Sequence, residues 1–351
     1  MTCERTGVCT MKKIISTVIC IVFILAMFTG CSKDETLTLM EREGKIKIGV
    51  VYLDETEDIL AAKAGFEKGI EESGIKNKVE IQYNDAKGDI ASLEKLCSKI
   101  FDKNDLVVTI GEEASIYAMS KREDDKKPIF FVGVNNPVTS SLMSNIITPS
   151  KNITGVMSKI TPDCIFSLAV DKIGTQLRKV GIIYNTSEIN PAYEINELKD
   201  YLNSNSIKYF EGVIANGFDA QQAALEIASE KLPKLDGSGE MENPKTVYVI
   251  SGDKVSLESL ESISTIIDNV GSIAFVLGKS ELPSKNFYSI IPNYKSMGYQ
   301  CVSLINEYIN GVEIAAISAK SSEEYDLLEF VSDETEEVKP SEEVENTQDE
   351  Q

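Results

Sequence analysis

The residue types that most hydrolases use for proton transfer are incomplete in this chain. Histidine is absent from the sequence, which excludes Ser-His and Cys-His nucleophiles and histidine-bound zinc. A hydrolase that works with Asp, Glu or Lys alone stays open as an alternative. The sequence also lacks a Walker-type lysine motif, so we do not expect it to hydrolyse ATP. We therefore expect a protein that is not an enzyme and that carries no cofactor or metal.

Three of the seven cysteines belong to the part of the chain that we expect to fold, namely Cys97, Cys164 and Cys301. Their number is odd, their spacing is wide, and no CxxC pattern occurs among them. Each lies in an apolar stretch with helical spacing, so we expect buried free thiols.

The start of the chain has the pattern of a secretory signal. Lys12 and Lys13 precede an apolar run at 14–28, and Thr29, Gly30 and Cys31 follow it. A cysteine at the cleavage point resembles a bacterial lipobox, which implies a signal peptide at 1–30, a lipid on Cys31 and a polar leader at 31–45. The alternative is an uncleaved membrane helix, although the run is short for a span. Both interpretations tether the rest of the chain outside the cytoplasm, whether translation begins at Met1 or at Met11.

The charge of the chain limits its partners. The formal net charge is −21, which argues against binding to nucleic acid or to anionic lipid. Much of this charge lies in the last thirty or so residues, and such an acidic run is typical of a solvated, disordered segment. We therefore expect an acidic tail at 321–351.

Between the leader and the tail, apolar β-rich runs alternate with segments of helical spacing. The first half predicts strands at 46–52, 79–83, 106–110 and 128–134, with helices at 58–73, 90–101 and 113–121. The second half predicts strands at 179–184, 208–213, 246–250, 273–277 and 287–291, with helices at 191–204, 220–231, 256–269 and 297–309. This alternation favours an α/β fold with parallel sheets that carry helices on both faces.

Two successive α/β units of similar size predict two Rossmann-like lobes around a ligand cleft. We place the N-terminal lobe at 46–150, with part of 278–320 returning to it, and the C-terminal lobe at 151–277. Ligands of open α/β sheets bind beyond the carboxyl ends of the strands. The loops that follow the strands are therefore the candidate binding site.

Several motifs in order resemble one known family. They are Asp85-Ala86-Lys87-Gly88-Asp89, Asn136-Pro137-Val138, Asn152-Ile153-Thr154-Gly155-Val156, and the stretch 179–185 with Glu188. Together they resemble the substrate-binding lipoproteins of ABC importers with the type I periplasmic-binding fold. The subgroup is the one that includes binders of tryptophan and other aromatic amino acids.

This resemblance implies a lipid-anchored receptor on the outer face of the cell membrane. It would capture a small ligand, such as an aromatic or other amino acid, by lobe closure and then dock, as a monomer, on a permease with its ATPase subunit. A ligand-sensing receptor lipoprotein that signals through a membrane partner is the alternative. Neighbouring permease and ATPase genes would favour the importer, and a neighbouring sensor kinase would favour signalling.

In the first lobe, the resemblance implies ligand contacts from the loops after the strands. The candidates are Glu55, Gly111, Glu112 and Asn136, with Tyr294 offering a ring face or a hydroxyl. The family carries Ala-Thr-Pro-Ala where this chain has Gly111-Glu112-Glu113-Ala114. We favour glutamates that point to solvent and complement the helix dipole there. If they face the cleft instead, the ligand is either rich in amino groups or bound in a different orientation. For Asn136, a turn before proline is an equal alternative.

In the second lobe, Glu188 and Asp253 follow strands and are candidates for binding an amino group. Capping of a following helix is the alternative for each of them. Asn185 and Tyr184 belong to the same predicted site, although core packing is the stronger interpretation for Tyr184. The sequence thus predicts a ligand site built mainly from carboxylates, amides and tyrosines.

Overall fold

The computed structural model describes residues 38–123, 127–173 and 177–331. The predicted signal peptide at 1–30 and the lipid-bearing Cys31 lie outside these ranges. The chain divides into Met1–Gly44 and Lys45–Gln351, and the second unit contains both sheets. In the described part of the chain, no helix is long and apolar enough to cross a membrane.

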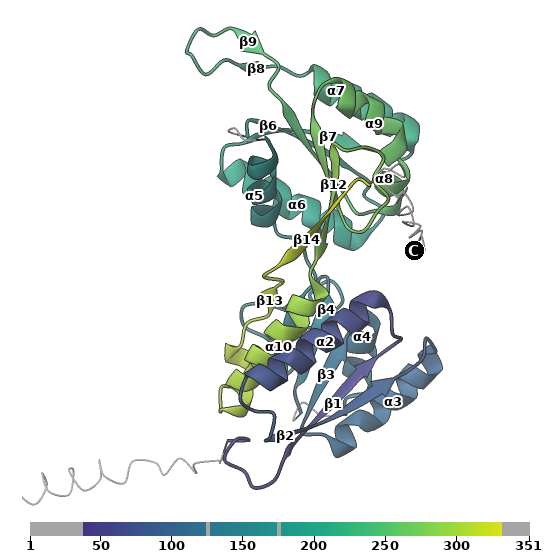
Figure 1. Ribbon diagram of the computed structural model, residues 1–351, viewed down its shortest axis with the longest axis vertical. Coiled ribbons are helices and arrows are strands. Elements are labelled where there is room, and N and C mark those ends of the chain that lie inside the picture. Colours follow the sequence, from purple (N-terminus) through teal and green to yellow (C-terminus); the bar gives the residue numbers. More distant parts are fainter. Residues whose placement is uncertain (1–37, 124–126, 174–176, 332–351) are drawn as a thin grey trace, which may run out of the picture. The chain divides into compact units, whose positions relative to one another are not determined.

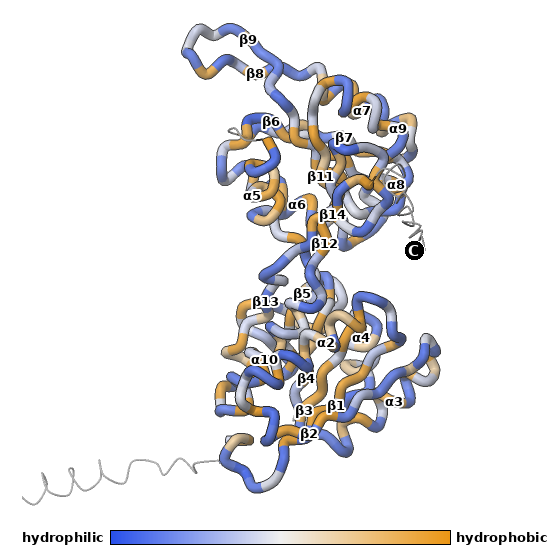
Figure 2. Tube along the Cα trace, viewed as in Figure 1, coloured by the Kyte–Doolittle hydropathy of each residue, from blue (hydrophilic) through white to orange (hydrophobic). Residues whose placement is uncertain are grey.

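The first sheet has six strands in the order β13-β5-β4-β3-β1-β2, and its strands pair in parallel. Its strands are β1 (Ile46–Tyr52), β2 (Val79–Asp85), β3 (Leu106–Ile110), β4 (Ile129–Val134), β5 (Ile153–Met157) and β13 (Lys320–Ser321). The central strands β1, β3 and β4 are apolar runs (Figure 2). Their residues are almost all buried. Such runs are typical of parallel strands that are covered on both faces.

Four helices cover the first sheet. The helices α2 (Glu57–Glu72) and α10 (Tyr294–Ile309) pack against each other on one face, and α3 (Ile90–Lys103) and α4 (Glu112–Lys121) pack together on the other (Figure 1). Two glycines allow the close crossing of α2 and α10. A Cβ atom on Gly65 would lie 1.8 Å from the carbonyl oxygen of Lys295, and one on Gly298 would lie 1.9 Å from that of Ala62. The C-terminal part of the chain thus returns to the first sheet.

The second sheet has the order β14-β12-β11-β10-β6-β7 and is parallel except for the antiparallel pair of β12 and β14. Its strands are β6 (Lys179–Tyr184), β7 (Lys208–Val213), β10 (Thr246–Ile250), β11 (Ile273–Leu277), β12 (Phe287–Pro292) and β14 (Tyr325–Glu329). One hydrophobic core lies under α5 (Pro162–Ile173) and α6 (Ile189–Ser204). Another lies under α7 (Gly217–Ser229) and α9 (Leu260–Asn269), with the short α8 (Lys254–Glu258) beside them. A small hairpin of β8 (Leu232–Pro233) and β9 (Met241–Glu242) follows α7, and a 3-10 turn (Ile314–Ala316) precedes β13.

The predicted α/β fold with two mainly parallel sheets is confirmed, and several boundaries need correction. Strand β5 pairs with β4 in the first sheet, so placing 151–277 wholly in the C-terminal lobe was wrong. Helix α5 was not predicted. The single helix predicted at 256–269 is two helices, α8 and α9, because the chain turns at Ser259.

The prediction of a disordered tail from residue 321 onward was wrong for its first part. Strand β13 ends at Ser321 beside β5, and β14 pairs with β12 from Tyr325 to Glu329. The side chains of Tyr325 and Leu327 pack on the core of the second lobe, which explains why an acidic segment forms a strand. The remainder of the predicted tail, 332–351, lies outside the described residues.

The three cysteines of the folded part are free thiols. Cys97 and Cys301 are buried, as predicted, and Cys164 is half-buried. Burial raises the pKa of Cys97 to about 12 and that of Cys164 to about 11, so these thiols stay protonated and unreactive at neutral pH.

Candidate functional site

A cavity of about 570 Å³ lies at the carboxyl ends of strands from both sheets. In the first sheet, β1 lies between β2 and β3, and the strand order reverses at this point. Tyr52 and Ile110 are register partners, so the loops after β1 and β3 begin next to each other. The carboxyl ends at such a reversal form the usual ligand crevice of α/β sheets.

Two helices begin at the cavity from these loops. Thr56 caps α2 by accepting a hydrogen bond from the backbone N–H of Ile59 (3.4 Å). Gly111 precedes α4 with a φ of 96°, a backbone conformation that favours glycine. Leu53, Thr56 and Gly111 all line the cavity. The site therefore lies against two helix starts, where backbone N–H groups are not used within the helix.

Both glutamates at the start of α4 line the cavity. Glu112 is half-buried and accepts a hydrogen bond from the hydroxyl of Ser140, while Glu113 is exposed. Our preference for glutamates that point to solvent was therefore wrong for Glu112, which lines the cavity and is held there by Ser140.

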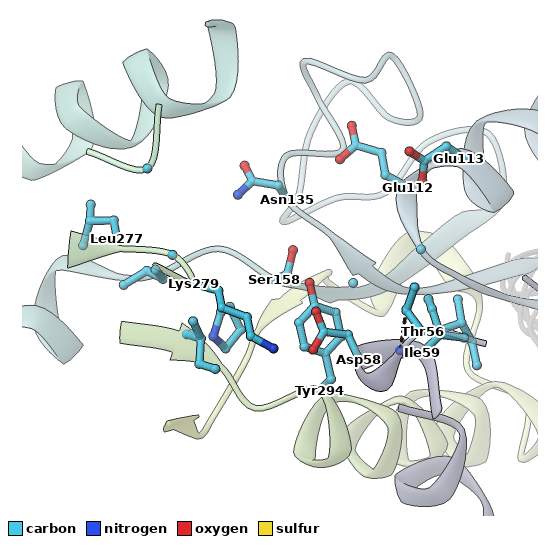
Figure 3. Close-up of a pocket in the computed structure, with 18 of the residues that line it drawn as sticks. Thr56, Asp58, Ile59, Glu112, Glu113, Asn135, Ser158, Leu277, Lys279 and Tyr294 are labelled. Atoms are coloured by element: carbon cyan, nitrogen blue, oxygen red, sulfur yellow. Dashed lines mark hydrogen bonds between the residues drawn. The ribbon is translucent and has the colours of Figure 1, made fainter. Parts of the chain in front are cut away.

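The centre of the cavity wall combines an aromatic ring with acidic and hydroxyl groups. Figure 3 shows Asp58 from α2, Tyr294 from α10 and Ser158 gathered there, with Glu112 and Asn135 on one side. Burial raises the pKa of Tyr294, and the nearby carboxylates Asp58 and Glu112 raise it further. The phenol therefore stays protonated and can donate a hydrogen bond to a ligand.

The second lobe contributes a half-buried carboxylate, Glu194 from α6. Its Oε1 accepts a hydrogen bond from Nδ2 of Asn135 (2.7 Å). Burial raises the pKa of Glu194 to about 7, while Asn135 and the charge of Lys159 partly oppose this. The carboxyl group thus changes its protonation near neutral pH, and it gains a full charge when a cation lies beside it.

The remaining wall is partly apolar and carries one cation. Ile59, Ile110, Ile160 and Leu277 line it. Lys279 lies at its edge and is exposed; its Nζ is 3.1 Å from Oε2 of Glu57. The cavity is thus suited to a ligand with an apolar part and a charged end.

Of the nine predicted ligand contacts, the structure brings Gly111, Glu112 and Tyr294 to the cavity. Glu55 lies beside it, exposed, with Oε1 3.4 Å from Nζ of Lys63. Asn136 is buried and forms a turn, because its Oδ1 accepts from the backbone N–H groups of Val138 (3.0 Å) and Thr139 (3.2 Å).

Three predicted residues of the second lobe, Asn185, Glu188 and Asp253, do not line the cavity, although the adjacent Gly252 does. The fully buried Asp253 caps α8 by accepting from Ser256 N (2.8 Å), and it also accepts from Asn185 N (2.9 Å). Glu188 accepts from Lys254 N at the start of the same helix (2.8 Å). The contacts of Asp253 are the helix-capping alternative considered for it. Glu188 makes no side-chain cap at its own following helix, α6, and bonds the start of α8 instead.

Tyr184, the fourth predicted residue of the second lobe, packs in the core of that lobe. Its hydroxyl donates to Glu211 (2.8 Å) and accepts from Lys199 (2.7 Å). Whether these residues contact a ligand stays a prediction, but the structure gives each of them another role.

Several cavity residues were not predicted from the sequence. Asp58 and Asn135 lie within three residues of predicted positions, so the correct loops were identified but not the correct side chains. Glu194 lies five residues inside a helix, and no motif marks it. Its carboxylate reaches the cavity because the first turns of α6 lie against the cavity wall.

Comparison with known proteins assigns the family. Residues 47–232, more than half of the 351, match the family model of the ABC transporter substrate binding protein. The chain belongs to this family. Its members bind a small ligand outside the cytoplasm, work with a permease and an ATPase, and are not enzymes. The family predicted from the sequence is thus confirmed.

Individual relatives extend over most of the chain. A tyrosine-binding protein of Clostridioides difficile (strain R20291) is 25% identical over 327 residues, which cover 90% of each chain. A substrate-binding protein with adhesive properties from Clostridium difficile, solved in its ligand-free, open form, is 22% identical with a TM-score of 0.63, covering 80% of this chain and 91% of its own. An arabinose-binding protein from Geobacillus stearothermophilus is 12% identical with a TM-score of 0.50, covering 82% and 97%. At these identities the structures show a shared fold, that of periplasmic binding proteins.

Proposed function

We propose that this protein is the lipid-anchored, extracytoplasmic receptor of an ABC importer and that it captures an amino acid or a related amine, aromatic ones included. The observation that carries the proposal is the cavity at the carboxyl ends of both sheets. It offers carboxylates for an amino group and the ring of Tyr294 beside an apolar wall. The 25% identity to a tyrosine-binding protein over 90% of each chain supports the same class of ligand.

Capture follows from the two-lobed fold. A ligand that contacts residues of both lobes stabilises the arrangement in which those residues are close together. We infer that this ligand-stabilised state is the one that the permease recognises, and that the receptor works as a monomer.

A thermal-shift screen of the full-length chain in detergent tests the ligand class. A ligand that binds only the folded protein stabilises it by about 2.7 kcal/mol at a hundredfold excess over its dissociation constant. We expect an increase in melting temperature with at least one amino acid or amine. The Tyr294→Ala variant should lose this increase, whereas Tyr299→Ala, an exposed tyrosine on the same helix, should keep it. Increases with sugars or nucleosides alone would refute the proposed ligand.

The anchor is tested at Cys31. The lipobox-like sequence around this cysteine and the apolar run before it support lipidation. We expect the Cys31→Ser variant to lose incorporation of labelled fatty acid, while the matched Cys97→Ser variant keeps it. Equal labelling of both variants would contradict an anchor at Cys31.

A further inference from the structure

The wall of the cavity has an excess of negative charge. Among the described residues that line it, five carry carboxylates and one carries an ammonium. The carboxylates belong to Asp54, Asp58, Glu112, Glu113 and Glu194, and the ammonium belongs to Lys279. The Nζ of Lys279 lies 3.1 Å from Oε2 of Glu57, which is outside this set. This exposed cation already has a carboxylate partner, so the described wall carries no cation without one.

The helix starts do not supply the missing positive charge. Backbone N–H groups at a helix start usually attract anions. Here Asp58 lies in the first turn of α2, and Glu112 and Glu113 lie in the first turn of α4. These carboxylates already complement the positive end of each helix dipole. A ligand carboxylate at either helix start would approach like charges.

A buried acceptor on the same wall is also unsatisfied. Oδ1 of Asn135 is buried and has no hydrogen-bond partner among the described residues. The other end of this amide, Nδ2, donates to Glu194 (2.7 Å), so it fixes the orientation of the side chain. An ammonium group has three donors and no acceptor. An unpaired amide oxygen therefore suits an ammonium donor and not a ligand carboxylate.

We propose that the cavity selects ligands whose positive charges outnumber their negative charges, that is, primary amines without a compensating carboxylate. This inference rests on the proposed function, because it names the class of ligand for the same cavity. The ammonium would lie among Asp58, Glu112 and Asn135, and the apolar part of the ligand would lie against Tyr294 and Ile59. A zwitterionic amino acid would offer the same ammonium but would also place a carboxylate in an acidic cavity.

Matched pairs of ligands test the inference by isothermal titration calorimetry of the full-length chain. Tyrosine and tyramine differ only in the carboxylate, and so do ornithine and putrescine. In whichever of the two pairs binds more tightly, we expect the dissociation constant of the amine to be at least tenfold lower than that of the matching amino acid. Amino acids that bind as tightly as their amines, or more tightly, would overturn the inference and leave the proposed function intact. Binding of no amine and no amino acid would overturn both.

Substitutions in the cavity wall test which side chains cause the preference for the amine. Asp58→Asn and Glu112→Gln each remove one negative charge, and each should reduce the preference for the amine by about tenfold. Glu71→Gln removes an equal charge from α2 at an exposed position paired with Lys76, and it should leave the preference unchanged. A melting temperature measured without ligand checks that each variant is folded. An unchanged preference in both wall variants would overturn the assignment of the amine to this wall.

Discussion

At the scale of single residues, Asp253 shows how one side chain serves two loops. Its carboxylate accepts from Ser256 N, Ser256 Oγ and Asn185 N, and it is fully buried. The carboxylate therefore joins the end of β6 to the start of α8. Carboxylate positions after strands are attractive ligand candidates in a sequence, but the same positions are where helices need caps.

We predict that Asp253→Ala lowers the free energy of unfolding by about 3 kcal/mol, because it removes a cap and leaves buried N–H groups without acceptors. Urea denaturation measures this change. Asp89→Ala removes an exposed cap from α3 and should cost only about 1 kcal/mol. A stable Asp253→Ala protein that no longer binds ligand would instead favour direct ligand contact.

Glu194 makes stability depend on pH. Burial raises its pKa from 4.5 to about 7, so the folded state holds this proton more tightly than the unfolded state does. Its contribution to stability is therefore full below about pH 4.5 and is lost as the pH rises through about 7.

Glu194→Gln should remove this dependence while keeping an acceptor for Asn135. We expect the variant without ligand to exceed the natural protein in unfolding free energy by on the order of 2 kcal/mol at pH 8.5, and to match it near pH 4.5. Glu197→Gln, which breaks the ion pair of Glu197 with Lys159 (2.9 Å), should bring no such gain. A pH-independent difference between Glu194→Gln and the natural protein would contradict the assignment.

At the scale of elements, the strands were the most predictable part. The bounds of β1, β3, β6, β10 and β11 agree with the sequence prediction, because buried parallel strands are short apolar runs between polar loops. Strand β14 was missed, because charged residues interrupt its apolar residues and its burial depends on pairing with β12. The cavity was predictable as a set of loops, but which side chain of each loop faces it depends on helix orientation.

The crossing of α2 and α10 gives a test at this scale. Gly65→Ala and Gly298→Ala would each place a methyl group within 2 Å of a backbone carbonyl, and we expect each to cost about 3 kcal/mol in unfolding free energy. Gly217→Ala in α7 meets no atom closer than 3.5 Å and should be neutral or gain up to about 1 kcal/mol. Thermal and urea denaturation of the three variants distinguish these outcomes, and equal stability of all three would show that the crossing adapts.

At the scale of the whole molecule, the described chain passes between the two sheets three times, after β5, after β12 and after β13. Hydrogen bonds link these passages. Ser322 N donates to Met157 O (3.1 Å), and Asn293 N donates to Glu324 O (3.0 Å). The last passage leads into β14, which covers the edge of β12.

We predict that a chain ending at Ser322 is less stable than one ending at Val331 by several kcal/mol, since it lacks the β14 ladder and the packing of Tyr325 and Leu327. The edge of β12 would then be exposed, and exposed edges promote association. Melting temperature and size-exclusion chromatography compare the two chains. Two monomers with the same melting temperature would contradict a structural role for β14.

The return of the chain has a consequence for its biosynthesis. Helix α10 covers the first sheet and β13 completes it, while β14 completes the second sheet. The first lobe therefore lacks contacts until Ser321 has been synthesised, and the second lacks contacts until Glu329 has been. Contacts between segments so distant in sequence form slowly. A chain whose two lobes are completed only near the end of synthesis stays unfolded during most of translation. An unfolded chain is the form that can be translocated across a membrane before it folds.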